Sequence, residues 1–321
     1  MRVVSIHEPV REELAEVQAA LERVTRSDVP VVREMLEHIL AGEGKRLRPT
    51  IALLAGRFGE HRPDLLVPLA ASIELLHTAT LVHDDVIDAS DTRRGKETTN
   101  ARYHNAAAVM LGDYMFAHAA DLICRTESLD VVKLFSRTLM AMATGELTQD
   151  MSAFEYGQGT MDYFRRIGGK TASLFATSAE GGALVAGARP AWREGLRTYG
   201  ESVGMAFQIV DDVLDFEGTD TELGKPAGSD LMQGTLTLPA LLLMERYPDD
   251  NPVKRLFGNE RSQDHLNEAL AMIRESDILE RSKAVAAEFR DRAVRALEVL
   301  PDTPDRAALA DIADYVLERR S

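Results

Sequence analysis

The longest proline-free stretch of the chain constrains the fold most. No proline lies between Pro68 and Pro190, and proline ends or kinks helices because it lacks a backbone donor. The interval is rich in Ala, Leu, Met and Glu, which are strong helix formers, and it rarely shows the β-branched alternation of strands. It therefore predicts several packed helices and an all-α fold.

The apolar pattern divides the chain into buried and peripheral helices. Five segments have broadly apolar faces, as expected for helices within a large bundle. They are residues 69–88, 105–125, 129–149, 163–186 and 193–216. Residues 8–24 and 263–321 space apolar positions three and four apart among many charges, which favours peripheral helices. Because no Ser/Gly-rich linker or internal repeat appears, we expect one domain over residues 1–321, with roughly ten or more helices.

The composition excludes several classes of protein. The 37 Lys+Arg against 52 Asp+Glu give a formal net charge of −15, so we expect no nucleic-acid partner, since phosphate binding needs basic surfaces. The start lacks the apolar run of a secretory signal, which favours a cytoplasmic location. The single Cys124 forbids an intrachain disulfide or a multi-cysteine metal site, and we expect it to be a small buried residue.

Two acidic motifs of the form DDxxD follow apolar runs. The first is Asp84, Asp85 and Asp88, and the second is Asp211, Asp212 and Asp215. On a helix, positions i and i+4 share a face, so each motif projects two or three carboxylates into one region. Glycines follow both motifs, which places the aspartates near the negative C-terminal end of each helix dipole. Such clustering is unfavourable unless a cation lies among the carboxylates.

The ligand chemistry indicates which cation. Oxygen ligands without an accompanying Cys or His cluster select Mg²⁺ or Mn²⁺ rather than zinc. A small number of carboxylates is typical of Mg²⁺ shared with substrate phosphates. The twelve-residue calcium loop of an EF-hand, with its central Gly and terminal Glu, is absent from the sequence.

Basic residues cluster in short motifs. They are Lys45, Arg46 and Arg48 in GKRLRP, Arg93 and Arg94 after the first acidic motif, and Lys170 and Lys225 beside glycines. Arg side chains match phosphate oxygens bidentately and Lys supplies a point charge, so these residues suit a diphosphate. His77, seven residues before Asp84, could donate to a phosphate.

Together these motifs resemble the trans-isoprenyl diphosphate synthases, in the branch that makes medium and long polyprenyl chains. GKRLRP, HTATLVHDDVID with DTRRG, LGDYMFAHA, GGKTASLF, FQIVDDVLDF and GKPAGSDL occur in the family's order and spacing, over most of the chain. The resemblance implies the isoprenoid synthase fold, a helical bundle around a central cavity. It implies a Mg²⁺-dependent prenyltransferase that condenses isopentenyl diphosphate head to tail (1′-4) with an allylic diphosphate, farnesyl or geranylgeranyl diphosphate.

The resemblance also implies a role for each matching residue. The six aspartates would hold Mg²⁺, three ions per active site with Mn²⁺ able to substitute, on the allylic diphosphate, and Lys170 and Arg93 would join them as catalytic residues. Arg93, Lys170 and Lys225 would complete the allylic pocket, with Thr171 and Gln208 at family positions around it. Isopentenyl diphosphate would be held by Lys45, Arg48, His77 and Arg94. The family often has a lysine in GKxTLP where this chain has Thr235, which implies weaker diphosphate binding or another cation.

Small side chains before the first motif predict a long product. Upstream of Asp84 the helix offers Ala79, Thr80, Leu76 and Ile73, and Ile73 lies roughly 16 Å away at 1.5 Å per residue. No aromatic plug appears there. A facing helix would present Ala117, Ala119 and Ala120 with Leu122 beyond, so we expect a product of about thirty to fifty carbons.

Three alternatives remain open. A class I terpene synthase also uses an aspartate-rich motif, but it usually lacks the second DDxxD and a GKRLRP-type site. A regulatory subunit of a heteromeric prenyl synthase would be expected to have lost aspartates that this chain keeps. An acidic helical interaction protein would show no Mg²⁺-dependent turnover. The resemblance further suggests a homodimer through helix faces near residues 105–145, and a long product implies transient membrane contact on release.

Overall fold

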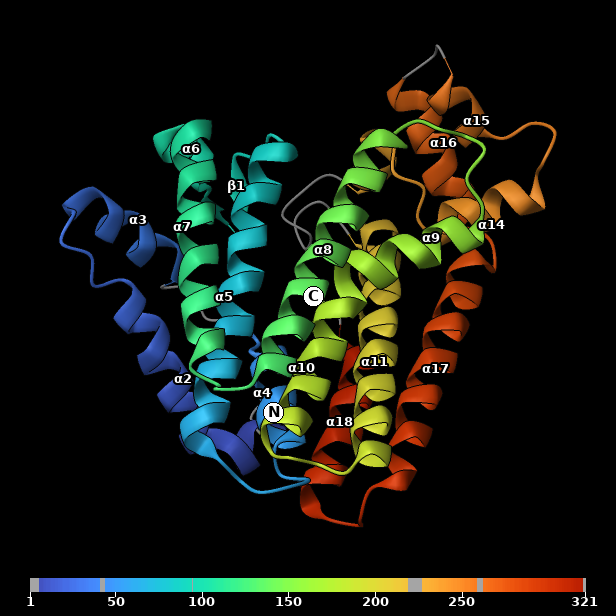
Figure 1. Ribbon diagram of the computed structural model, residues 1–321. Coiled ribbons are helices and arrows are strands. Elements are labelled where there is room, and N and C mark those ends of the chain that lie inside the picture. The colour runs from blue at the N-terminus through green and yellow to red at the C-terminus, as the bar shows by residue number, and fades with distance from the viewer. Residues whose placement is uncertain (1–5, 41–43, 94, 219–226, 259–261, 320–321) are drawn as a thin grey trace. The chain divides into compact units, whose positions relative to one another are not determined.

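The computed structural model describes residues 6–40, 44–93, 95–218, 227–258 and 262–319. These residues are almost entirely helical (Figure 1), which confirms the all-α prediction. Within them, strand structure is confined to a hairpin of β1 (Thr92–Arg93) and β2 (Lys96–Glu97), in which Thr92 pairs with Glu97.

The chain forms two compact units. Unit 1 comprises Met1–Arg137, Leu174–Gly200 and Ala296–Ile312, and unit 2 comprises Thr138–Ser173, Glu201–Arg295 and Ala313–Ser321. Their boundaries fall inside α8 (Leu129–Met151), α10 (Ser173–Val185), α11 (Pro190–Glu217), α17 (Ile278–Ala296) and α18 (Pro304–Glu318). The single domain over residues 1–321 remains a prediction.

Unit 1 is built around one long apolar helix. Its other elements are η1 (Glu8–Val10), α2 (Arg11–Val24), α3 (Pro30–Leu40), α4 (Leu47–Ala55), α5 (Pro63–Ile87), the hairpin, α6 (Thr99–Tyr103), α7 (Asn105–Cys124) and η3 (Leu297–Val299). Helix α5 packs along α7 (Figure 1) and also contacts α2 and α4. Between Leu66 and Leu76 every α5 residue except Pro68 is buried, as the broadly apolar sequence predicts.

The start of α5 differs from the prediction. The helix begins at Pro63 rather than at residue 69, and Pro68 lies inside it. Proline at the first helical position is favoured, because its fixed φ suits the helix. Pro68 follows so early that it removes only one intrahelical hydrogen bond near an end, where other donors already lack partners.

Unit 2 contains an interruption that the periodicity does not reveal. Its other elements are α9 (Thr160–Ile167), η2 (Gly168–Ala172), α13 (Ser229–Met232), α14 (Leu238–Arg246), α15 (Pro252–Phe257) and α16 (Gln263–Arg274). The predicted helix over 163–186 is helical up to Val185, but η2 within it is a π-helical turn. Such turns occur often at functional sites, and this one carries Lys170 and Thr171.

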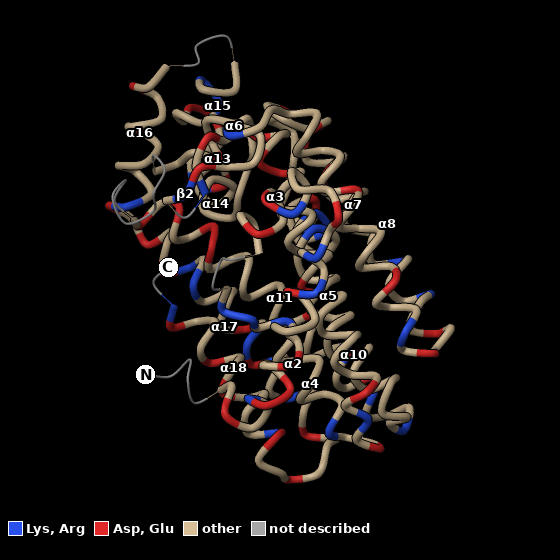
Figure 2. Tube along the Cα trace, turned by 90° about the vertical axis from the view of Figure 1, so that its left-hand side faces the viewer, with Lys and Arg blue, Asp and Glu red and all other residues tan. Residues whose placement is uncertain are grey.

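The peripheral helices and the cysteine test two smaller expectations. Charges of both signs lie along α17 and α18 (Figure 2), as their spaced apolar positions predict.

The expectation that Cys124 is buried is wrong, because this residue is exposed at the end of α7. By length and composition α5 and α7 could each cross a membrane, but 67% of the apolar stretch of α5 is buried within the protein.

Candidate active site

The first acidic motif lies at the C-terminal end of α5, as predicted. Asp84 is half-buried, Asp85 is 6% exposed, and Asp88 is exposed where it caps the helix. The N–H of Asp88 donates to the carbonyl of Asp84 at 2.8 Å, and that of Ser90 donates to the carbonyl of Asp85 at 2.9 Å. The carboxylates therefore stand at the negative end of the helix dipole.

The hairpin after α5 returns an arginine to this motif. Arg93 of β1 donates from Nε to Oδ1 of Asp85 at 2.6 Å. Burial raises the pKa of Asp85, and the charge and hydrogen bond of Arg93 oppose that rise. The structure thus brings Arg93 to the first motif, whereas Arg94 lies outside the described residues.

A histidine anchors the end of α5 to α7. His83, which immediately precedes Asp84, is 3.0 Å from the carbonyl of Val109 through Nε2. Its ring lies where a Cβ on Gly112 would stand, since that atom would be 2.1 Å from Nε2. A glycine at 112 therefore allows the close contact that holds the helix end carrying the first motif.

The basic cluster of GKRLRP separates into two kinds of side chain. Arg46 adopts a left-handed conformation (φ 45°) before α4, and its guanidinium donates to Oε1 of the buried Glu74 at 2.5 Å. The guanidinium of Arg46 therefore pairs with an interior carboxylate of unit 1. Lys45 is exposed, and the guanidinium of the half-buried Arg48 lies 4.2 Å from the ring centre of Phe175.

The residues predicted to set product length lie on α5 as expected. Ile73, Leu76 and Ala79 are fully buried, and the half-buried Thr80 donates its hydroxyl to the carbonyl of His77 at 2.7 Å. His77 is also half-buried, two turns before Asp84.

The facing surface of α7 is only partly as predicted. Ala119 and Leu122 are buried, but Ala117 and Ala120 are exposed, so the expectation that they face α5 is wrong. Helical spacing explains this, because Ala119 and Leu122 are three residues apart on one face while Ala117 and Ala120 lie on another.

The second acidic motif contains a buried aspartate within a hydrogen-bonded network. Asp212 is 3% exposed. Tyr163 of α9 donates its hydroxyl to Oδ2 of Asp212 at 2.6 Å, and Gln208 donates to Oδ1 at 2.9 Å. Thr171 in turn donates to Oε1 of Gln208 at 2.7 Å. The structure thus joins Thr171 and Gln208, both named from family resemblance, to this motif.

Burial shifts the pKa of Asp212 toward neutral pH. Burial and then the charge of Asp230 raise the pKa of Asp212 to about 7, although the hydrogen bonds from Tyr163 and Gln208 oppose the rise. Tyr163 is almost fully buried and is not among the site residues predicted from the sequence. A buried tyrosine on an apolar face gives no sequence signal for a partner 49 residues away.

This pKa predicts a pH-dependent stability of the metal-free protein. Between about pH 4 and pH 7 the folded protein keeps a proton on Asp212 that an unfolded chain, with a pKa near 3.8, releases. The free energy of unfolding therefore falls as pH rises through this window, by about 4 kcal/mol at most. Urea unfolding in EDTA at pH 4.5 and pH 8 should show that the free energy of unfolding falls less between these pH values in Asp212→Asn than in the wild type. The exposed-site control Asp249→Asn should lose as much as the wild type. A loss in Asp212→Asn as large as in this control would contradict the raised pKa of Asp212.

The other two aspartates of the second motif differ in exposure. The side chain of Asp211 is 41% exposed and forms an ion pair with Arg319. Asp215 is 2% exposed, and Ser229 donates its hydroxyl to Oδ1 of Asp215 at 3.2 Å. Both motifs therefore combine buried carboxylates with accessible ones, and the accessible ones are better placed to bind an ion.

Lys170 is held by α8 within unit 2. Its Nζ lies 2.5 Å from Oε2 of Glu146 and 3.5 Å from Oε1 of Gln149. A Cβ on Gly145 would lie 2.9 Å from the backbone nitrogen of Lys170, so a glycine allows α8 to approach the π-helical turn. Lys225 lies outside the described residues.

A buried arginine lies beside the missing lysine of GKxTLP. Arg166 of α9 is 5% exposed and donates to the carbonyl of Leu236, next to Thr235, at 2.5 Å. Burial lowers the pKa of Arg166, and the neighbouring acidic groups, Asp230 among them, oppose this. Arg166 therefore supplies positive charge to the surroundings of the second motif.

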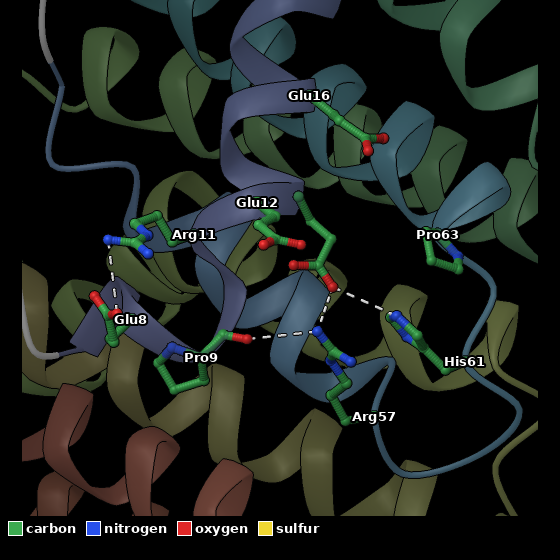
Figure 3. Close-up of a pocket in the computed structure, with 9 residues that line it drawn as sticks. Glu8, Pro9, Arg11, Glu12, Glu16, Arg57, His61 and Pro63 are labelled. Atoms are coloured by element: carbon green, nitrogen blue, oxygen red, sulfur yellow. Dashed lines mark hydrogen bonds and ion pairs between the residues drawn. The ribbon is translucent and has the colours of Figure 1, made fainter.

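A surface pocket of about 440 Å³ in unit 1 involves none of the predicted site residues (Figure 3). Arg57 in this pocket donates to the carbonyl of Pro9 at 3.4 Å and pairs with Glu13, and His61 lies 3.4 Å from Oε1 of Glu13. These contacts tie the chain after α4 to η1 and α2.

The donor set fits a magnesium ion that shares its ligands with a substrate. Among the residues that the structure describes, no three His, Cys, Asp or Glu side chains form a group that could hold a metal ion alone. Mg²⁺ commonly binds through one or two carboxylates and completes its shell with water and phosphate oxygens. The half-buried Asp84 and Asp211 and the exposed Asp88 suit that role.

The comparisons with known proteins identify the family. The sequence model described as Polyprenyl synthetase matches residues 29–273. The chain belongs to this family, and it is accordingly an all-α prenyltransferase of the medium- and long-chain trans-prenyl diphosphate synthase class. The family resemblance, fold class, enzyme class and general function predicted from the sequence are thereby confirmed.

Individual relatives match over nearly the whole chain. It is 38% identical to heptaprenyl diphosphate synthase component 2 of Bacillus subtilis strain 168, over 95% of this chain and 87% of that protein. It is 38% identical to octaprenyl diphosphate synthase of Escherichia coli K12, over 99% of each. The crystal structure of polyprenyl synthase from Caulobacter crescentus CB15, complexed with calcium and isoprenyl diphosphate, has a TM-score of 0.94 and 36% identity, over 99% of this chain and 98% of that one.

Proposed function

We propose that this chain condenses isopentenyl diphosphate head to tail with an allylic diphosphate, farnesyl or geranylgeranyl diphosphate, to make a trans-polyprenyl diphosphate of about thirty to fifty carbons. The observation that supports this best is the presence of both complete aspartate motifs at helix ends, each with basic, hydroxyl or amide partners already in contact. The family works on isopentenyl and allylic diphosphates and generally depends on divalent metal.

We propose Mg²⁺ as the metal, three ions per active site with Mn²⁺ able to substitute, held by both aspartate motifs on the allylic diphosphate. Bound metal would neutralise the charge that develops on the leaving diphosphate. Among the accessible carboxylates, Asp84, Asp88 and Asp211 are the best candidates for direct ligands. The buried Asp85, Asp212 and Asp215 are held by neighbouring side chains, which fixes the ends of α5 and α11.

The basic residues supply the remaining charge. Lys170 and Arg93 would bind oxygens of the allylic diphosphate, and both already contact carboxylates that limit their motion. Lys45, Arg48 and His77 would bind isopentenyl diphosphate. From the family resemblance of the sequence, Lys225 would bind the allylic diphosphate and Arg94 would bind isopentenyl diphosphate. No protein nucleophile is needed, because the double bond of isopentenyl diphosphate attacks the allylic cation and a proton then leaves, with the departing diphosphate as its acceptor.

The apolar side chains of α5 would set product length. Ile73, Leu76 and Ala79 are fully buried and lie at or beyond the turn preceding Asp84. None of these side chains carries an aromatic ring that would stop a growing chain, and their apolar surface would exclude the water that otherwise quenches the cation to an alcohol.

We also propose a homodimer through α7 and α8. On α7, Met110 is 72% and Val109 41% exposed, and on α8 Met140 is 60% exposed. Exposed apolar side chains of this size mark interaction surfaces. Analytical ultracentrifugation should show a dimer that dissociates in the variant Met110→Glu, with the exposed-site control Met161→Glu remaining dimeric. A monomeric wild type would refute the proposal.

We propose that the enzyme works in the cytoplasm and touches the membrane only to release product. The burial of 67% of the apolar stretch of α5 within the protein argues against a role of α5 as a membrane span. Fractionation of cells that express the chain tests it, since firm retention in the membrane fraction after high-salt washing would contradict a transient contact.

The decisive experiment measures incorporation of radiolabelled isopentenyl diphosphate with each allylic primer, with and without Mg²⁺. We expect turnover that EDTA abolishes and Mg²⁺ restores, and chromatography of the dephosphorylated products should show polyprenols. Cyclised or unextended hydrocarbons would favour a class I terpene synthase. Turnover only after addition of a second protein would favour a subunit of a heteromeric synthase.

A further inference from the structure

A buried arginine reaches the second acidic motif from α18. Arg319 directly follows this helix, and its side chain is only 5% exposed. Its Nη2 donates to the carbonyl of Phe207 at 2.8 Å, and its guanidinium lies 3.7 Å from the centre of the Phe207 ring. The same guanidinium forms an ion pair with Oδ1 of Asp211. All three residues belong to unit 2.

These contacts fix the guanidinium before it meets the carboxylate. Phe207 and Asp211 are four residues apart on α11 and so share a face of the helix. Stacking on the ring and bonding to the carbonyl leave the planar group little freedom, and the Nη2 that bonds to the carbonyl of Phe207 also holds Oδ1 of Asp211. Lysine could supply the charge at this position but not the planar group that stacks on the ring.

Asp211 is the member of the second motif that such a contact would affect most. Asp212 is 3% exposed, and both of its oxygens accept hydrogen bonds from side chains of unit 2. Asp211 keeps 41% of its side-chain surface exposed, so it remains accessible to an ion while Arg319 holds Oδ1. Groups that orient a metal ligand in this way raise metal affinity, and their loss typically costs 10- to 100-fold.

We propose that Arg319 is a positioning residue that orients the carboxylate of Asp211 for a divalent cation. This rests on the proposed function, in which Asp211 is a metal ligand. A positive charge near an ion also repels it, but the ion pair with Asp211 already offsets the charge of Arg319. We therefore expect the loss of orientation to outweigh the relief of repulsion, so removal of Arg319 should weaken metal binding.

The test measures Mn²⁺ binding by electron paramagnetic resonance, using the metal-free full chain with inorganic pyrophosphate as the second ligand. We expect Arg319→Gln to bind Mn²⁺ about 10-fold more weakly than the wild type, and Arg319→Lys to fall between them. The matched control is Arg290→Gln on α17, which removes an ion pair between Arg290 and Asp314 of α18. This variant should bind Mn²⁺ as the wild type does. Unchanged or tighter binding in Arg319→Gln, or an equal loss in the control, would overturn the proposal.

Two further variants keep the outcome decisive. If circular dichroism shows that Arg319→Gln does not fold, Arg319→Lys and Phe207→Leu provide the test, because both keep the positive charge but lose the stacking of the guanidinium on the ring. Wild-type affinity in both would overturn the inference. Asp211→Asn separates this inference from the proposed function. If Asp211→Asn binds Mn²⁺ as the wild type does, the metal assignment itself fails. If only Asp211→Asn loses affinity, the positioning role of Arg319 alone fails.

Discussion

The variant Asp84→Asn is expected to lose about 100- to 1,000-fold in kcat/KM, and Asp211→Asn a similar amount, because each removes a charged ligand that acts on the developing negative charge of the leaving diphosphate. Both residues are half-buried rather than fully buried, so the substitutions should leave the fold intact. Turnover of radiolabelled isopentenyl diphosphate at several Mg²⁺ concentrations measures the effect. Higher Mg²⁺ should restore part of the activity, since a weakened ion site is filled by mass action.

The matched control is Asp64→Asn, at the other end of the same helix α5. Asp64 is exposed and pairs with Arg62, so its loss should change turnover by less than about twofold. The double variant of Asp84 and Asp211 should lose less than the product of the single losses, because residues that act as a unit are not additive. Turnover near the wild-type level in either single variant would refute the proposed role of that motif.

The variant Ala79→Phe is expected to shift the main product to much shorter chains. Ala79 is fully buried, about 7.5 Å along the helix axis from Asp84 at 1.5 Å per residue, and a phenyl ring there would block a chain that grows along α5. Overpacking should cost about 1–3 kcal/mol of stability. Chromatography of the dephosphorylated products measures chain length directly.

Ala70→Phe provides the control for this substitution. Ala70 is equally buried on α5 but lies nine residues, or two and a half turns, before Ala79 and therefore on the opposite face. It should carry a comparable cost in stability with no change in product length. The same product from Ala79→Phe as from the wild type would exclude this part of α5 as the determinant of length.

Much of the local structure was predictable from the sequence. The helices containing both aspartate motifs lie where apolar periodicity and the absence of proline placed them, and α5 and α11 end just where the motifs end. The main errors have local physical causes. Pro68 is tolerated in the first turns of α5, and the π-helical turn at Gly168–Ala172 does not change the apolar pattern enough to be seen.

The pairing of charges was not predictable in this way. The sequence presented Lys45, Arg46 and Arg48 as one basic cluster, but a left-handed backbone at Arg46 turns its guanidinium to the buried Glu74. Arg166 and Tyr163 gave no signal, although both influence Asp212. Nothing in the sequence distinguished Asp212 from Asp211, yet Asp212 is buried, which raises its pKa to about 7, and Asp211 is accessible.

Helical periodicity, proline placement and motif spacing are properties of short segments, so the amino-acid sequence was enough to predict the helices, the position of each acidic motif on them and the family. The accessibility of each carboxylate, and the cation that neutralises it, depend on packing between segments that are distant in the sequence. Partners such as Tyr163 and Asp212, or Arg319 and Phe207, are 49 and 112 residues apart. Packing between distant helices brings them together, and burial then sets their charge state.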